Sequence, residues 1–296
     1  MPIEERLLGH SKDIGGGLVV RRVLPAHPRR SVGPFVFFDH FGPITETAQD
    51  NHDVRPHPHI GLATVTYLFE GAMMHRDSLG FVQRIEPGAI NWMTAGGGIV
   101  HSERTPEELR AKTRRLHGLQ LWAALPQHDE ETAPGFTHAA AESLPEASAP
   151  DLTVRVLIGS MFGKRSPVAT FAETLYLDVR AAPGSTWVLP APSPHTERAV
   201  YSVDQPLAID GADVPAHVMA VLAPGAEATI SAPEGARYVV IGGAPLDGPR
   251  FIWWNFVSSS RERIEQAKAA WTAQQMGKIP GEHEWIPLPD PLRSPH

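Results

Sequence analysis

Residues 62–68 read Leu62-Ala63-Thr64-Val65-Thr66-Tyr67-Leu68, a short run of apolar, β-branched and aromatic side chains. Such runs favour β-strands, because these side chains pack well on a pleated surface. Similar runs, separated by Gly and Pro turns, extend from Gly16 to about Leu125: residues 17–23, 35–38, 82–85 and 89–93. They resume after residue 150: residues 152–158, 175–179, 186–189, 199–203, 218–222, 228–230 and 238–241. This spacing is typical of an all-β sandwich or barrel and leaves no room for the crossover helices of a βαβ fold.

The composition of the 296 residues excludes several classes of protein. Hydrophobic residues make up 42%, enough for a buried core, and the 26 glycines and 29 prolines favour many short strands over long helices. There is no cysteine, so thiol nucleophiles, disulfides, thiolate zinc sites and iron–sulfur clusters are excluded. The net charge of −7, without a basic tract, argues against direct binding of nucleic acid. The 15 histidines are therefore the main transition-metal ligands in the chain.

The chain begins Met1-Pro2-Ile3-Glu4-Glu5-Arg6, which is charged and is followed by no apolar segment of a secretory signal. Its apolar runs, such as Val218-Met219-Ala220-Val221-Leu222, are far shorter than the roughly 20 residues of a membrane-spanning helix. We therefore expect a soluble, cytoplasmic protein that does not bind a membrane.

The length predicts about two domains of roughly 150 residues. Between Pro126 and Pro150 the sequence changes to Ala, Glu, Pro and His with few β-branched residues, which indicates a linker. We therefore expect an N-terminal domain at residues 1–130, a linker at 131–150 and a C-terminal domain at 151–296. A weak repeat suggests that the two halves are related, because Pro-Gly is followed by Trp at residues 87–92 and again at 183–187.

One helix is predicted near the end of the chain. Ser259 and Glu262 have the spacing of a capping box, in which the hydroxyl and the carboxylate bind amides of the first turn. Ile264, Ala267 and Trp271 follow at helical spacing and predict one face packed on a barrel. The Pro-rich residues 279–296 are expected to form an extended tail along the surface.

Two His-containing pairs suggest a metal site. In a strand, residues i and i+2 point to the same face with Cα atoms roughly 6.6 Å apart, so His57 and His59 can share one ion. His101 and Glu103 repeat this spacing, behind the glycine-rich turn at residues 96–98. Two such strands facing across a small barrel predict three imidazoles and one carboxylate, a set that suits Fe(II), Ni(II), Mn(II), Cu(II) or Zn(II). Either pair alone is more typical of ordinary structural residues, and only the occurrence of both pairs in one β-rich half makes a metal site as well supported as a structural role.

The other histidines are interpreted as structural. His75 lies in a polar turn and is expected to pair with Asp77, and His40 is expected in an apolar loop as a hydrogen-bonded residue. The remaining candidates, expected at the surface, are His52, His117 and His128. The sequence has no Gly-x-Ser-x-Gly elbow for a serine hydrolase and no Gly-rich loop that leads from a strand into a helix for phosphate binding.

Five segments follow in order between about residues 36 and 105: Phe38-Asp39-His40-Phe41-Gly42-Pro43, His57-Pro58-His59-Ile60-Gly61, Thr64-Val65-Thr66-Tyr67-Leu68-Phe69-Glu70-Gly71, His75-Arg76-Asp77-Ser78-Leu79-Gly80 and Trp92-Met93-Thr94-Ala95-Gly96-Gly97-Gly98-Ile99-Val100-His101-Ser102-Glu103. This ordered set resembles the pirin family, and Trp253-Trp254-Asn255-Phe256-Val257-Ser258-Ser259 is compatible with the end of that family. The resemblance implies a bicupin, with two antiparallel β-barrel domains packed together and a C-terminal helix.

The resemblance also implies a metal site at His57, His59, His101 and Glu103, with iron as the usual metal. Some pirins resemble quercetin 2,3-dioxygenases, which open a flavonol with O₂ and release carbon monoxide. Others are described as regulators that act through a partner protein. The chain departs from the family pattern at Ala63, where many cupins have a glutamate, and at Gly97, where an arginine is common. The second half keeps only His195 and Glu197, so we expect its barrel to bind no metal.

Two hypotheses follow for the function. In the first, the protein is an iron-dependent dioxygenase of the quercetin 2,3-dioxygenase type, with a flavonol-like aromatic substrate and O₂, and Glu103 accepts the substrate's hydroxyl proton. In the alternative, it is a non-enzymatic metal-binding regulator that acts through a protein partner. A purely structural ion is the third interpretation.

Overall fold

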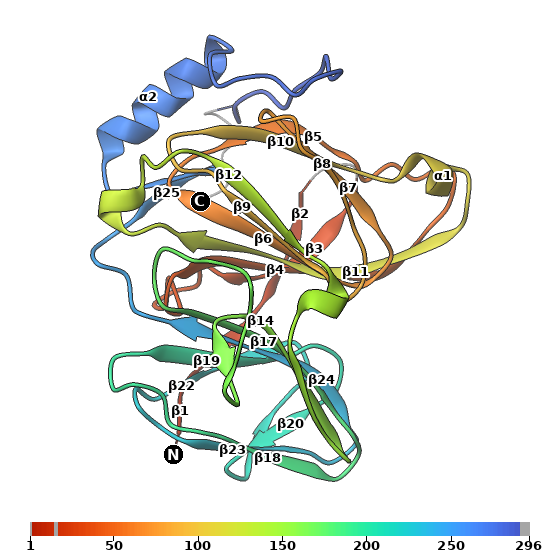
Figure 1. Cartoon of the computed structure of the whole chain (residues 1–296), viewed down its shortest axis with the longest axis vertical. Coiled ribbons are helices and arrows are strands. Elements are labelled where there is room, and N and C mark those ends of the chain that lie inside the picture. Colours follow the sequence, from red (N-terminus) through yellow and green to blue (C-terminus); the bar gives the residue numbers. More distant parts are fainter. Residues whose placement is uncertain (1, 15–16, 291–296) are drawn as a thin grey trace. The chain divides into compact units, whose positions relative to one another are not determined.

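The structure is a computed structural model that describes residues 2–14 and 17–290. Strands dominate it, as the sequence predicts, and they pair in antiparallel fashion (Figure 1). The chain forms two compact units, each built from three segments. Of the described residues, the histidine unit contains those within 12–20, 40–138 and 247–290, and the companion unit contains those within 2–11, 21–39 and 139–246.

Two sheets carry the histidine unit. The larger has the order β12 (Gly135–Ala139), β9 (Ile90–Thr94), β6 (Leu62–Glu70), β11 (Arg114–Ala124), β4 (Phe35–Glu46), β3 (Val19–Leu24) and β2 (His10–Asp13). The smaller has the order β5 (Val54–His59), β10 (Ile99–Arg104), β7 (Met73–Asp77) and β8 (Val82–Ile85). The unit also contains a hairpin of β25 (Phe251–Trp253) and β26 (Phe256–Ser258), the short helices α1 (Glu107–Arg110) and η1 (Gln127–Asp129), and a longer helix near the end of the chain.

The companion unit repeats this plan. Its larger sheet has the order β1 (Ile3–Leu8), β22 (Val218–Leu222), β19 (Glu197–Ser202), β24 (Ala236–Gly243), β17 (Thr174–Ala181), β14 (Leu152–Ile158) and β13 (Glu146–Ala149). Its smaller sheets contain β18 (Ser185–Leu189), β23 (Ala228–Ala232), β20 (Leu207–Ile209) and β21 (Ala212–Val214), and β15 (Ser160–Met161) with β16 (Lys164–Arg165). A core of buried aliphatic side chains around Trp187 and Tyr238 fills the space between its sheets.

The domain limits expected at residues 130 and 150 stay a prediction, but the compact units are not contiguous in sequence. Residues 131–150, expected to be a linker, contain β12, the 3₁₀ helix η2 (Ala141–Ser143) and β13. The two strands end up in different units, with β12 beside β9 and β13 beside β14. The sequence did not predict these strands because they contain few β-branched residues. They form because they pair with neighbouring strands of higher β propensity.

Strand β5 carries the first His pair at one edge of the smaller sheet. Pro56 and Pro58 alternate with His57 and His59, and such prolines are tolerated at an edge because they have no N–H to donate to a ladder. The turn after β5 depends on Gly61, which has φ +67° and lies so close to the carbonyl of Val257 that an added Cβ would be 2.0 Å from that oxygen. Only glycine satisfies both conditions at this turn.

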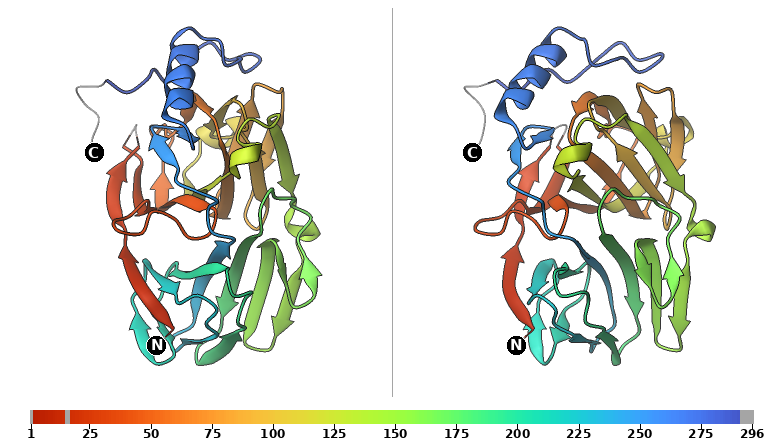
Figure 2. Two further views of the ribbon diagram at one scale, coloured as in Figure 1. Left: turned by 90° about the vertical axis from the view of Figure 1, so that its left-hand side faces the viewer. Right: turned by 60° about the vertical axis from the view of Figure 1, so that its left-hand side comes forward.

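Helix α2 (Arg261–Thr272) is the predicted C-terminal helix, but its cap is shifted by one residue. The Oγ of Ser260, not of Ser259, accepts the N–H of Arg263, while Ser259 donates both its N–H and its hydroxyl to Glu130. The predicted apolar face is confirmed: the buried residues of α2 are Ile264, Ala267 and Trp271. They pack on Ile60, Val100 and Phe256. Figure 2 shows α2 and the chain that follows it in blue.

The chain after α2 is extended along the same strands, as predicted for residues 279–290; residues 291–296 lie outside the described part. Ile286 donates its N–H to the carbonyl of Pro56 and accepts the indole N–H of Trp271. Glu282 accepts hydrogen bonds from Ser102 and Arg104 of β10. The tail therefore covers the edge strand β5 and the outer face of β10.

The two α-helices within residues 2–14 and 17–290 are short, and neither has the length and hydropathy of a membrane-spanning helix.

Replacement of Trp271 by alanine is expected to lower the free energy of unfolding by about 3–5 kcal/mol, because this side chain is buried between α2, β10 and the tail. Trp285 is the matched control, since it is 46% exposed and its alanine variant should change stability by less than about 1 kcal/mol. Urea unfolding of the metal-free proteins measures both values. Equal losses for the two variants would contradict the packing described for α2.

Candidate metal centre

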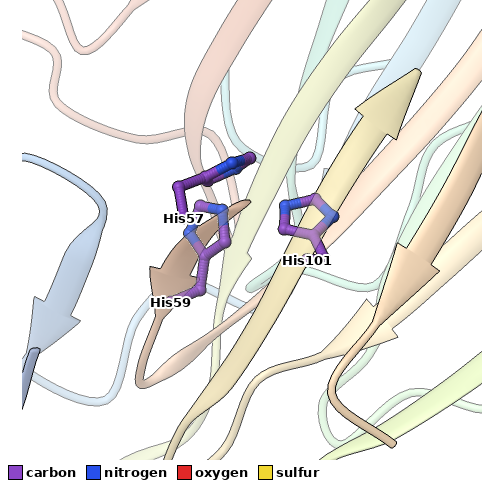
Figure 3. Close-up of side chains that lie close together, drawn as sticks. All are labelled: His57, His59 and His101. Atoms are coloured by element: carbon purple, nitrogen blue, oxygen red, sulfur yellow. The ribbon is translucent and has the colours of Figure 1, made fainter. Parts of the chain in front are cut away.

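His57, His59 and His101 come together inside the histidine unit (Figure 3). In the antiparallel pair of β5 and β10, His57 lies directly opposite His101, and His59 follows two residues later on the same face. The ring centroid of His101 is 4.3 Å from that of His57 and 5.0 Å from that of His59. One ring nitrogen from each of the three residues lies within 4.8 Å of the other two. Strand register alone therefore creates this cluster, as the spacing predicts.

The hydrogen bonds of the cluster leave one type of nitrogen for a metal. Nδ1 of His57 donates to the carbonyl of Arg55 at 2.9 Å, and Nδ1 of His59 donates to the carbonyl of Asn255 at 3.1 Å. A carbonyl only accepts, so both rings carry their proton on Nδ1 and present a lone pair on Nε2. Nε2 of His101 is buried and has no hydrogen-bond partner among the described residues. Two imidazoles with Nε2 lone pairs, beside a third whose Nε2 no described residue binds, fit a divalent transition-metal ion.

Burial keeps these imidazoles neutral. It lowers the pKa of His57 to about 4, and the pKa values of His59 and His101 lie well below the ordinary value. The neighbouring imidazoles lower the pKa of each ring further, because a second positive charge in the cluster is unfavourable. A metal ion binds only the neutral form, so at neutral pH these residues have no proton to release.

Glu103 lies on the same strand but is not part of the three-residue group. The pairing of β10 with β5 is irregular between His101 and Glu103, so Glu103 pairs with Val54 and not with Arg55. Desolvation raises the pKa of Glu103 to about 7, and a hydrogen bond with the side chain of Thr66 offsets part of this rise. Near neutral pH this carboxyl group can therefore both release and accept a proton.

The predicted pair of His75 and Asp77 is confirmed, with Nε2 of His75 2.9 Å from Oδ2 of Asp77. The polar turn expected there is wrong: His75 and Asp77 lie on β7 and are both buried. Nδ1 of His75 is 3.5 Å from Nδ1 of His101, so the pair adjoins the three-histidine cluster.

The other histidines follow the predictions in part. His40 is buried and hydrogen-bonded as expected, but it lies on β4 and its partner is His117, with the two Nε2 atoms 2.7 Å apart. The surface position expected for His117 is therefore wrong, because β11 places this ring in the interior. His52 is half-buried and pairs with Glu46, whereas His128 is exposed as predicted.

Sequence reasoning missed the groups that orient the histidines. The carbonyl of Asn255 is 196 residues from His59 and belongs to the turn between β25 and β26. Backbone carbonyls carry no sequence signal, although the segment Trp253-Trp254-Asn255-Phe256 that supplies this one is distinctive. At Gly97 the backbone carbonyl accepts a hydrogen bond from Arg263 of α2, which ties the glycine-rich turn to the helix.

The metal-free protein is expected to lose stability as the pH falls below about 6.5. In the unfolded chain the imidazoles bind protons near their ordinary pKa of about 6.5, whereas in the folded protein the pKa of His57 is lowered to about 4, so acid favours unfolding. Each such residue contributes up to about 1.4 kcal/mol per pH unit in this window. Urea titrations between pH 7 and pH 5 should therefore give a smaller slope for His57→Gln than for the parent, while His128→Gln leaves it unchanged. An equal slope in all three proteins would contradict the neutral, buried state of His57.

Comparison with known proteins identifies the family. The family model described as Pirin matches residues 17–123, and the one described as Pirin C-terminal cupin domain matches residues 176–277. A pirin-like protein of Caulobacter vibrioides is 48% identical, over 94% of this chain and 96% of its own. A Pseudomonas aeruginosa protein provisionally named a quercetin 2,3-dioxygenase is 37% identical, over 90% of this chain and 83% of its own. The crystal structure of quercetin 2,3-dioxygenase from Acinetobacter baumannii matches with a TM-score of 0.90 and 34% identity, over 99% of this chain and 97% of its own. The chain is a member of the pirin family, with two cupin domains.

Proposed function

We propose that this protein is an iron-dependent dioxygenase of the quercetin 2,3-dioxygenase type, which opens a flavonol-like substrate with O₂ and releases carbon monoxide. The observation that carries the proposal is the buried cluster of His57, His59 and His101, whose Nε2 atoms are available to a metal ion. Support comes also from the similarity to the P. aeruginosa and A. baumannii proteins named for this activity. Imidazole ligands suit Fe(II), and also Ni(II), Mn(II), Cu(II) and Zn(II).

Glu103 is proposed as the fourth ligand and as the general base. Its place on β10, two residues after His101, keeps it at the same face of the sheet as the histidines. In the metal-free site desolvation raises the pKa of Glu103 to about 7, and a bound cation would lower this pKa, so that the carboxylate is ionised and can accept a proton at neutral pH. His57, His59, His101 and Glu103 would hold the metal, and the substrate would bind to the same ion.

A metal ion held by these residues would act as a Lewis acid toward the oxygens of a flavonol and would promote its reaction with O₂. The protein contributes the rest. Glu103 would take the proton of the substrate's hydroxyl group. The carbonyls of Arg55 and Asn255 hold His57 and His59 in a fixed orientation throughout.

Carbon monoxide release is the direct test. Protein reconstituted anaerobically with Fe(II) and then given quercetin and air is expected to consume O₂ and release CO in equal amounts. The His101→Ala variant should release none, because one metal-binding imidazole is gone, and the exposed His128→Ala variant should behave as the parent. No CO from parent protein that holds one metal ion per chain would overturn quercetin as the substrate.

Glu103→Gln separates the two roles of the carboxylate. Loss of the general base is expected to lower kcat by about 10²–10⁴-fold while most of the metal is retained by the three histidines. Equal loss of metal and activity in Glu103→Gln would show instead that Glu103 is needed mainly as a ligand.

A further inference from the structure

A chain of buried side chains leads from His101 away from the metal cluster. Nδ1 of His101 is 3.5 Å from Nδ1 of His75, and Nε2 of His75 is 2.9 Å from Oδ2 of Asp77. The exposed fractions of these three residues are 1%, 5% and 0%. Strand register creates the arrangement, because His101 on β10 pairs directly with Asp77 on β7.

Asp77 is held at both oxygens. Its Oδ1 accepts the N–H groups of Leu79 at 2.9 Å and of Phe81 at 3.1 Å, and its Oδ2 faces His75. A carboxylate that accepts at both oxygens fixes the donor opposite it, so His75 carries its proton on Nε2. The ring of Phe136 stacks on His75 with centroids 4.3 Å apart and 13° between the planes, which holds the imidazole in this orientation.

This proton arrangement determines the state of His101. With its proton on Nε2, a neutral His75 has a lone pair on Nδ1, which accepts from Nδ1 of His101. His101 then carries its proton on Nδ1 and has a lone pair on Nε2, the buried atom without a hydrogen-bond partner among the described residues. For His57 and His59 a carbonyl gives the same result directly, whereas the neighbour of His101 is an imidazole that can either donate or accept. The carboxylate of Asp77 removes this ambiguity for a neutral His75.

We propose that Asp77 and His75 are positioning residues that hold His101 in the tautomer with a free Nε2 and thereby prepare it to bind the metal. The proposal rests on the metal centre of the proposed function, but it concerns the hydrogen-bond chain and not the substrate. Partners of this kind typically change metal affinity by about 10–100-fold when they are removed.

Asp77→Asn is the informative variant. It reverses the direction of the hydrogen bonds that link residue 77, His75 and His101, while the side chain at position 77 keeps its size. The asparagine has one side-chain oxygen, and the N–H groups of Leu79 and Phe81 both donate to it. Its amide nitrogen therefore faces Nε2 of His75 and donates to it. His75 then donates from Nδ1 to His101, and the proton of His101 moves to Nε2, where it blocks metal binding. The control is Glu46→Gln, which makes the same change in another buried carboxylate bonded to a histidine, His52.

Two measurements test the proposal. Long-range ¹H–¹⁵N NMR of the metal-free protein with labelled histidines should give the Nδ1–H tautomer for His101 in the parent and in Glu46→Gln, and the Nε2–H tautomer in Asp77→Asn. Titration with Co(II), followed by its visible absorption, should give an affinity lower by about 10–100-fold for Asp77→Asn. His75→Phe, which keeps an aromatic ring against Phe136, should lower the affinity similarly, and adding Asp77→Asn to it should have no further effect.

The outcomes distinguish the two proposals. An unchanged His101 tautomer in Asp77→Asn would overturn the proposed relay, that is, the hydrogen bonds by which Asp77 and His75 orient His101. The relay would also be overturned if Asp77→Asn lowered the Co(II) affinity equally in the parent and in His75→Phe. Parent protein that binds no Co(II) would overturn the metal centre itself, while the NMR measurement still decides the relay. Co(II) binding that follows the predicted pattern without any CO release would support the relay and contradict the proposed activity.

Discussion

The antiparallel register between β5 and β10 is the constraint on which the site depends. It sets His57 opposite His101, and the two-residue period of the strand adds His59 to the same face. A shift of one residue in this pairing would turn His57 and His59 of β5 to the other side of the sheet and leave the prolines of β5 on the side that His101 faces. The bend at Gly61, the hairpin that carries Asn255 and the contacts of α2 all act on this one pair of strands.

Placing three imidazoles in a desolvated site has an electrostatic consequence. Burial lowers the pKa of each ring, and any proton on one ring disfavours a proton on the others. The opposite shift at Glu103 follows from the same desolvation, because burial always disfavours the charged form. A divalent ion would bind the neutral imidazole nitrogens and would stabilise the ionised form of Glu103, because it supplies the positive charge that the site lacks.

Much of the fold and of the cluster could be predicted from the sequence. The strand-like runs, the apolar face of α2 and the convergence of His57, His59 and His101 follow from periodicity and spacing. What could not be predicted depends on contacts between distant segments. His117 resembles a surface residue in sequence, yet β11 places it against His40. The N-cap of α2 is Ser260 because Ser259 is hydrogen-bonded to Glu130. The chain from Asp77 through His75 to His101 is of this kind as well, because its links join two strands through their side chains.

The covering of β5 by the C-terminal tail has a consequence for the behaviour of the protein at high concentration. An uncovered edge strand offers its backbone groups to a second molecule and can start aggregation. Here two prolines remove N–H donors from that edge, and the N–H of Ile286 occupies the carbonyl of Pro56. The strand that carries two of the three clustered histidines is therefore a poor template for intermolecular pairing. These histidines can lie on an edge strand that does not promote aggregation.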